Sequence, residues 1–252
     1  MSVAACAALV ERGDPDRFAA TLAVPAQQRG DLLTLYAYNL ELARAPWVAS
    51  TPLIAEMRLQ WWRDVLDARQ APAHEVAGPL HDLIGRAGLP VALLDEMAAA
   101  RRWDISDQPF AGTEELLAYV GQTSGHLMVL AALCLGAPAQ SEAALREIAL
   151  GAGIAGFLRA AAELSARGRH PLPDDSDAGI VALARLGQEA LERGRARPLP
   201  APAARAALTA WAAAPLLRQA AQEPARVRQG RLSLSPFTRR ARLAWAALTG
   251  RV

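Results

Sequence analysis

The sequence predicts an all-α protein that folds as a single domain over residues 1–252. Hydrophobic residues make up 52% of the chain and aromatic residues only 5%, so the apolar content is mostly Ala and Leu, which favour helices over strands. Apolar residues recur at helical spacing, and no segment shows the alternation that is typical of a strand. The length is enough to bury a complete core without a second domain.

Two amphipathic helices are predicted in the first third of the chain. The first begins at Asp31, whose carboxylate suits the positive end of a helix, and it ends or kinks at Pro46. The second helix follows Pro52. Its apolar residues fall on one stripe, as is typical of a helix that packs against a core: Leu53, Met57, Trp61 and Val65.

The rest of the chain continues as helices separated by Gly and Pro. The expected ranges are about 76–87, 90–103, 114–136, 142–166, 176–194, 202–221 and 236–249, which gives eight to ten helices in all. Gly151, Gly153 and Gly156 lie inside the helix over 142–166, where each costs on the order of 1 kcal/mol relative to Ala. The close approach of another backbone or of a ligand would explain them.

Charge and cysteine content argue against several classes of protein. The net charge is only +2, although all 27 cationic residues are Arg, and no basic stretch is interleaved with aromatic residues, so we expect no nucleic-acid partner. Cys6 and Cys134 are the only cysteines, which argues against a disulfide framework. The four histidines show no zinc-like spacing.

Contact with a membrane is expected at most at the periphery. The N-terminus lacks the cationic residues of a secretory signal, and no uninterrupted apolar run reaches the roughly 18 residues that cross a bilayer. Arg239, Arg240 and Arg242 would suit an acidic membrane surface, but we interpret them as complementing the dipole at the end of their helix. We therefore expect a cytoplasmic protein, at most peripheral to the inner membrane.

Five segments, in order, resemble parts of squalene/phytoene synthases. They are DPDRF at 14–18, LLTLYAYN at 32–39, AEMRLQWWRD at 55–64, YVGQTSGHLMVLAALCLGA at 119–137, and 153–173 with its RGRHPLP ending. The third is similar especially to a divergent branch of the family that includes a mitochondrial complex I assembly factor. The last is similar in length and layout to the second aspartate-rich motif of the family.

The resemblance implies a helical bundle of the isoprenoid synthase type with a central cavity. In that family two aspartate-rich helices face each other and hold magnesium against prenyl diphosphates. Carboxylates spaced i, i+4 lie on one helix face, so they can share hard cations. The metal neutralises the leaving diphosphate while an allylic carbocation forms.

This chain departs from both metal motifs. Other residues stand at the positions of the aspartates: Ala43, Arg44 and Trp47 in the first motif, Ala160 and Leu164 in the second. Only Glu41 remains near the first motif, and no two acidic residues of the chain are spaced i, i+4. We therefore assign no catalytic residue and no metal ligand, and we expect no cofactor, with Mg²⁺ needed only if the protein is an enzyme.

Residues that would bind a ligand can still be proposed from the resemblance. Arg44, Arg159 and Arg169 would hold a diphosphate directly, or they form salt bridges and lie in solvent. Glu41 and Glu163 would form a pair across the cavity that holds magnesium weakly at most. The residues expected to line the cavity are Tyr36, Asn39, Glu41, Ala43, Gly156, Ala160 and Glu163.

Three functions follow from these observations. The loss of the aspartates favours a degenerate, non-catalytic member of the family that helps to assemble a membrane-bound respiratory complex and binds its subunits. The alternative is a magnesium-dependent prenyltransferase that joins two prenyl diphosphates head to head through Glu41 and Glu163. A third hypothesis is a carrier or sensor of an isoprenoid, in which the cavity is kept and the chemistry is lost.

Overall fold

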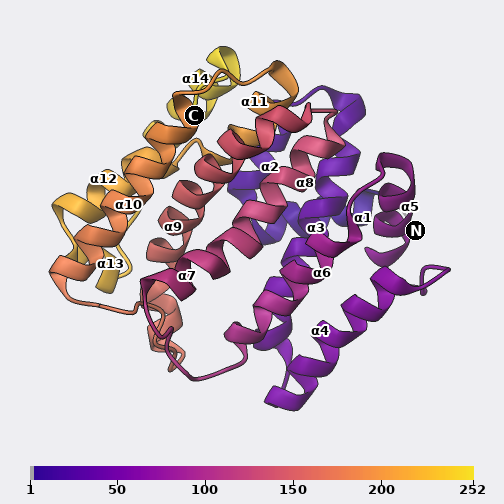
Figure 1. Cartoon of the computed structure of the whole chain (residues 1–252), viewed down its shortest axis with the longest axis horizontal. Coiled ribbons are helices and arrows are strands. Elements are labelled where there is room, and N and C mark those ends of the chain that lie inside the picture. The colour runs from indigo at the N-terminus through magenta and orange to yellow at the C-terminus, as the bar shows by residue number, and fades with distance from the viewer. Residues whose placement is uncertain (1–2) are drawn as a thin grey trace.

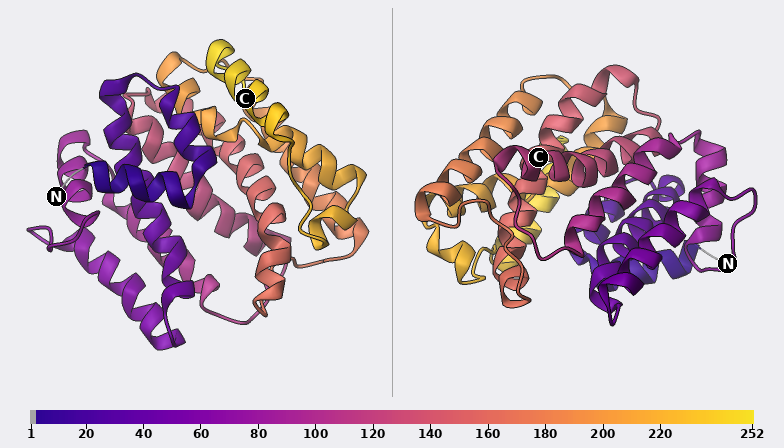
Figure 2. Two further views of the ribbon diagram at one scale, coloured as in Figure 1. Left: turned by 180° about the vertical axis from the view of Figure 1, so that it is seen from behind. Right: turned by 60° about the horizontal axis from the view of Figure 1, so that its bottom comes forward.

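The computed structural model describes residues 3–252, and every regular element in this range is helical. This confirms the predicted all-α class. The N-terminal helices lie on the right of Figure 1 and the C-terminal helices on the left, with the helices from the middle of the chain between them. Figure 2 shows the same two halves from behind and from below.

The helices follow one another with short connections. The N-terminal half contains α1 (Val3–Gly13), α2 (Pro15–Leu22), α3 (Ala26–Val48), α4 (Pro52–Asp67), α5 (Ala77–Ala87), α6 (Val91–Ala100) and the 3₁₀ turn η1 (Arg101–Asp104). The middle contains α7 (Thr113–Val120), the π-helical turn η2 (Gly121–Gly125), α8 (His126–Cys134), η3 (Ala139–Ser141) and α9 (Glu142–Ala166). The remainder contains α10 (Asp177–Arg195), α11 (Ala201–Ala207), η4 (Leu208–Ala210), α12 (Ala213–Gln222), α13 (Ala225–Arg228) and α14 (Pro236–Thr249).

The number of helical segments is larger than the eight to ten predicted. The chain forms α1 and α2 before the first predicted helix, and η4 divides the helix that was expected over 202–221. Pro46 does not end α3, which continues to Val48. Proline removes the hydrogen bond from its own nitrogen and its ring crowds the carbonyl of Leu42, and α3 ends soon after it, at Val48.

Two long helices organise the core. Helix α3 packs against α1, α4, α5 and α8, and helix α9 packs against α10, α12 and η2. Tyr38 of α3 is fully buried, and its hydroxyl donates a hydrogen bond to the carbonyl oxygen of Leu94 in α6 (2.9 Å). These two helices carry the segments that resemble the metal motifs, so their packing positions the candidate site.

The buried face of α4 differs from the one predicted. Leu53 and Met57 are 70% and 63% exposed, and Trp61 is also at the surface. The helix is apolar on two sides, and the side that packs inward consists of Ala55, Leu59, Trp62, Val65 and Leu66. Trp62 anchors this side of α4 to the core, because its ring packs edge-on against Tyr38 with 5.3 Å between the ring centres. Of the predicted stripe, only Val65 is buried.

The three glycines of α9 have two different roles. A Cβ atom at Gly151 would lie 2.6 Å from the carbonyl oxygen of Gly187 in α10, and one at Gly153 would lie 2.4 Å from Val120 in α7. These two glycines therefore allow α9 to approach its neighbours closely. A Cβ atom at Gly156 would meet no atom within 4 Å.

Two helical stretches are long and apolar enough to cross a membrane, by length and composition alone. They are Thr113–Cys134 and Ala139–Ala166. The sequence prediction concerned uninterrupted apolar runs, and both stretches contain charged residues, among them Glu115 and Arg159. In an apolar window of 18 residues, 67% of the first stretch and 44% of the second are buried within the protein. Core helices pass the same test, and both stretches pack against other helices of this fold.

Candidate functional site

A small central cavity lies between the two halves of the molecule. Its volume is about 120 Å³. Side chains from α2, α3, η2, α8, α9, η4 and α12 line it, and Tyr36, Met128 and Trp211 supply much of its apolar wall. Gly156 faces this cavity, which explains why no protein atom lies close to the position of its missing Cβ.

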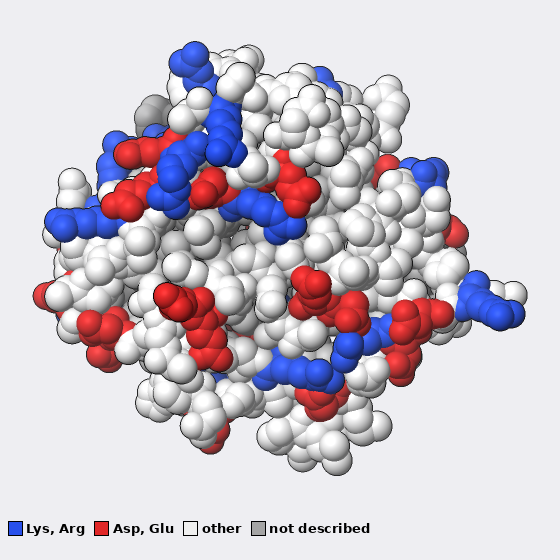
Figure 3. Space-filling model, in the orientation of Figure 1, with Lys and Arg blue, Asp and Glu red and all other residues white. Residues whose placement is uncertain are grey.

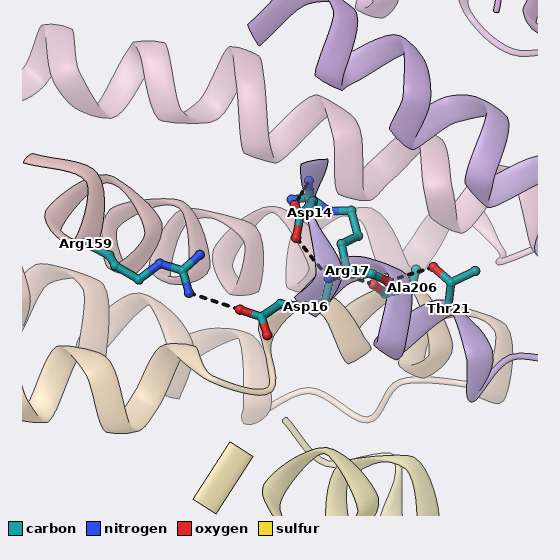
Figure 4. Close-up of polar contacts among 7 residues, drawn as sticks. Asp14, Asp16, Arg17, Thr21, Arg159 and Ala206 are labelled. Atoms are coloured by element: carbon teal, nitrogen blue, oxygen red, sulfur yellow. Dashed lines mark hydrogen bonds and ion pairs between the residues drawn. The ribbon is translucent and has the colours of Figure 1, made fainter. Parts of the chain in front are cut away.

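All charged side chains that line the cavity are paired within the protein (Figure 4). Asp16 of α2 accepts a hydrogen bond from Arg159 of α9 (3.1 Å) and forms a second ion pair with Arg239 of α14. Asp14 caps the start of α2 and pairs with Arg17 at 2.7 Å. The guanidinium of Arg17 also lies 5.2 Å from the centre of the Tyr36 ring. The cavity therefore presents no charged group that lacks a partner.

A tryptophan joins the C-terminal end of α3 to the segment after α9. The guanidinium groups of Arg167 and Arg169 lie 4.8 Å and 5.6 Å from the centre of the Trp47 ring, within the range of cation–π attraction. Arg169 also donates a hydrogen bond to the carbonyl oxygen of Ser106 at 2.5 Å. Arg167 pairs in addition with Glu163 at 2.6 Å. These contacts hold the two helix ends together without a carboxylate pair.

The residues at the predicted metal positions do not fit magnesium. Magnesium binds oxygen ligands, chiefly carboxylates. The side chains of Ala43, Trp47, Ala160 and Leu164 offer no oxygen at these positions. Within residues 3–252, no group of three or more His, Cys, Asp or Glu side chains is placed to hold a metal ion.

The arrangement of the helices and the order of the motifs agree with one family. A family model for squalene/phytoene synthase matches residues 10–250. The chain belongs to the squalene/phytoene synthase family. This confirms the resemblance, and it extends the match well beyond residue 175, where the recognisable motifs end.

The curated proteins that match this chain are named as assembly factors. The chain is 28% identical over 174 residues to the protein named NADH dehydrogenase (ubiquinone) complex I, assembly factor 6, from Bos taurus, and 27% identical to the Homo sapiens protein of the same name. Each match covers 68% of this chain and 52% of the relative. The chain thus spans about half the length of the curated relatives it matches.

Two solved structures show the fold. A crystal structure of a dehydrosqualene synthase in complex with ligand has a TM-score of 0.79 at 15% identity, and the match covers 96% of this chain and 94% of the other. Squalene synthase HpnC from Alicyclobacillus acidocaldarius has a TM-score of 0.64 at 15% identity, covering 98% and 94%. The helical fold of the isoprenoid synthases is therefore shared, as predicted.

The predicted site residues do not form one site. They lie in the central cavity, in a second groove, or outside both. Tyr36, Gly156 and Arg159 line the central cavity. Glu41 and Arg44 line a separate groove of about 380 Å³ between α3 and α4, where they form an ion pair of 3.5 Å. The others lie outside the lining of both: Asn39 is buried in α3, Ala43 and Ala160 are half-buried, Glu163 is exposed, and Arg169 packs on Trp47.

Glu41 and Glu163 therefore do not meet across the cavity. Glu41 lies in the groove beside α4, and the Glu163 side chain is 68% exposed at the far end of α9, where it pairs with Arg167. A magnesium site built on these two carboxylates has no geometric support. The reason is the helical register, which directs the side chain of Glu41 toward α4 rather than toward α9.

Sequence reasoning missed the residues of α2 and η4. Asp14, Asp16 and Arg17 belong to the DPDRF segment, which was used for the resemblance but not considered for the site. Their charged side chains at the start of a short helix were the available signal. Thr209 and Trp211 lie beyond the recognisable motifs, and no sequence pattern marks them as cavity residues.

A buried polar cluster lies outside the lining of the cavity. Tyr119 of α7 donates a hydrogen bond to Asp104 at 2.8 Å and accepts one from Arg101 at 2.8 Å, and Arg101 also pairs with Asp104 at 3.1 Å. Burial raises the pKa of Tyr119, so its hydroxyl stays protonated. Trp103, stacked on Phe110 with 3.9 Å between the ring centres, covers the cluster. The cluster fixes η1 to α7 and does not face the cavity.

Proposed function

We propose that this protein is a non-catalytic member of the squalene/phytoene synthase family that acts by binding, in the assembly of a membrane-bound respiratory complex. The observation behind this proposal is the small volume of the central cavity. Its volume of about 120 Å³ is well below the roughly 300–1,000 Å³ of pockets that bind small organic ligands. The positions of the metal-binding aspartates hold side chains that do not fit magnesium.

The chemistry of the family depends on charge that this cavity does not supply. Ionising a prenyl diphosphate requires cations at the leaving group, which magnesium and its carboxylates provide. Arg159 is the one predicted diphosphate ligand in the cavity, and its guanidinium is bound to Asp16. A diphosphate would have to displace that carboxylate, so neither the prenyltransferase alternative nor an isoprenoid held in this cavity is favoured.

The names of the relatives support a role in complex assembly. Proteins named complex I assembly factor 6 match two thirds of this chain, so we propose that the present protein contacts a subunit of respiratory complex I or of a similar complex. The location we propose is cytoplasmic and peripheral to the inner membrane, where such complexes are assembled.

We assign the binding surface to the exposed apolar face of α4. This face consists of Leu53, Ile54, Met57 and Trp61, and the groove that holds Arg44 and Arg58 runs along its edge. A contiguous exposed apolar stripe on a soluble helix typically marks a contact with another protein. The occupant we propose is an apolar segment of the respiratory subunit, with Arg58 pairing to a carboxylate at its border.

Deletion of the gene followed by complementation tests this function. We expect the deletion strain to lose assembled complex I on native gels and the wild-type gene to restore it. A Leu53→Ser/Met57→Ser variant should fail to restore the complex at an equal protein level. The matched control is Phe237→Ser/Leu248→Ser, which removes two residues of α14 that are 82% and 87% exposed. Wild-type levels of complex I in the deletion strain would refute the assembly role.

A further inference from the structure

A second, larger pocket lies between α10, α12 and α14. Its volume is about 830 Å³, which falls within the range of pockets that bind small ligands. Arg195 of α10, Arg218 of α12 and Arg242 of α14 converge on it, and Leu191, Leu199 and Trp245 provide apolar surface. Blue side chains, with red ones among them, lie at the upper left of Figure 3, over the end of the molecule where α10 and α14 lie. This pocket shares no lining residue with the central cavity.

The three arginines form no ion pair with a carboxylate among residues 3–252, although Glu192 of α10 also lines the pocket. Other arginines of α10 and α14 do form ion pairs: Arg193 of α10 pairs with Glu147 at 3.0 Å, and Arg239 of α14 pairs with Asp16. The Nε atom of Arg242 donates one long hydrogen bond of 3.4 Å to the carbonyl oxygen of Trp211. The remaining donors of the three guanidinium groups are available to a ligand.

The positive charges of the pocket act on one another. Burial lowers the pKa of Arg195, the charges of Arg242 and Arg218 lower it further, and the smaller effect of the Glu192 carboxylate acts in the opposite direction. Burial and the charge of Arg218 likewise lower the pKa of Arg242. Like charges that face each other in a partly dehydrated pocket cost free energy, and a bound anion would offset this cost.

The helix dipole does not account for these arginines. The sequence interpretation placed Arg239, Arg240 and Arg242 at the end of their helix, where they would complement its negative end. In the structure they lie in the first half of α14, and the last turn of α14 contains no basic residue. The earlier interpretation is therefore wrong, and Arg242 needs another explanation.

We propose that this pocket binds a phosphate-bearing ligand that also has an apolar portion. The planar guanidinium groups of Arg195, Arg218 and Arg242 match the oxygens of a phosphate or diphosphate. Leu191, Leu199 and Trp245 would cover the apolar portion. Two sources offer this chemistry, a free phosphate ester and the headgroup of an anionic lipid, and the pocket fits either. The proposal does not rest on the assembly function.

Binding measurements on the full chain distinguish the two sources. Titration calorimetry with inorganic pyrophosphate and with dihexanoyl phosphatidate, below its micelle concentration, tests the free ester. Sedimentation with phosphatidylcholine vesicles, with and without phosphatidate, tests the lipid headgroup. We expect the dihexanoyl compound to bind more tightly than pyrophosphate, because its chains cover Trp245. Binding to the soluble probes alone assigns a free ester, and binding to the vesicles alone assigns a lipid.

Matched variants show whether the pocket is responsible. Arg195→Gln/Arg218→Gln should weaken binding of whichever probe binds by about tenfold or more, since each charge-assisted hydrogen bond to phosphate contributes substantially. The control Arg185→Gln/Arg240→Gln removes the same charge from exposed positions of α10 and α14 outside the pocket and should change binding less than about threefold. Melting temperatures establish that both variants are folded. An equal loss in the two variants, or no binding of any probe, overturns the proposal.

Discussion

The guanidinium of Arg167 lies 4.8 Å from the centre of the Trp47 ring, and this contact ties the end of α3 to the end of α9. Trp47 stands where the family motif has an aspartate, and Arg167 follows the segment that resembles the second motif. A cation–π contact thus takes the place of the bridge that carboxylates and magnesium make between these helices in the family pattern. Side chains therefore connect these two helix ends directly.

Replacing Trp47 should therefore destabilise the protein. Trp47→Ala removes the contacts with both Arg167 and Arg169, and we expect the free energy of unfolding to fall by about 2 kcal/mol. Trp47→Phe keeps an aromatic face and should lose less. Urea denaturation of the three proteins measures the difference. An unchanged stability of Trp47→Ala would show that the ring does not join the two helices.

Two glycines of the same helix should respond in opposite directions. Gly151→Ala places a methyl group 2.6 Å from the backbone oxygen of Gly187, so we expect a loss of about 1–3 kcal/mol. Gly156→Ala points into open space, so its stability should be unchanged or rise by up to about 1 kcal/mol through helix propensity. Denaturation of the two variants makes the comparison. Equal effects would contradict the close packing of α9 on α10.

The orientation of α4 predicts which of its apolar residues matter for folding. Leu59→Ala should cost about 2–5 kcal/mol, because Leu59 is fully buried. Met57→Ala should change stability by less than about 0.5 kcal/mol, because the Met57 side chain is 63% exposed. Thermal denaturation of both variants separates this arrangement from the stripe expected from the sequence, for which Met57 would be the more sensitive position.

Stability should fall at alkaline pH through Cys134. Burial raises the pKa of this thiol from 9.0 to about 12. Below pH 9 both the folded and the unfolded chain keep the proton, so Cys134 gives no pH dependence there. Between pH 9 and 12 the unfolded chain loses it and the folded chain does not, so stability decreases as the pH rises.

The variant Cys134→Ala isolates this contribution. Its free energy of unfolding should decline less steeply between pH 9 and 10 than that of the wild type. The difference in slope corresponds to the release of up to about one proton on unfolding. Denaturation at several pH values measures both slopes. Tyrosine ionisation affects the two proteins alike, so parallel curves would mean that the Cys134 thiol is not protected by the fold.

The helical class and the family could be predicted from sequence because both depend on local signals. Ala and Leu content, helical spacing and the order of five motifs survive even where the chemistry has changed. The loss of the metal motifs was also visible, since Ala43 and Ala160 occupy aspartate positions.

The geometry of the site could not be predicted in the same way. Which of its two apolar sides α4 buries depends on the contact of Trp62 with Tyr38, which joins residues on different helices. The pairing of Asp16 with Arg159 joins positions 143 residues apart, and the basic pocket around Arg218 assembles three helices from beyond the recognisable motifs. Tertiary packing decides such features, and a single sequence carries no record of it.

We have proposed that the protein binds a partner and does not catalyse a reaction. The most direct measurement is diphosphate release by the purified protein given farnesyl or geranylgeranyl diphosphate with magnesium. We expect no release above the protein-free blank, because the cavity is small and its two carboxylates, Asp14 and Asp16, are already paired with arginines. Magnesium-dependent release that an Arg159→Gln variant loses would contradict it and would show that an active site persists in this cavity.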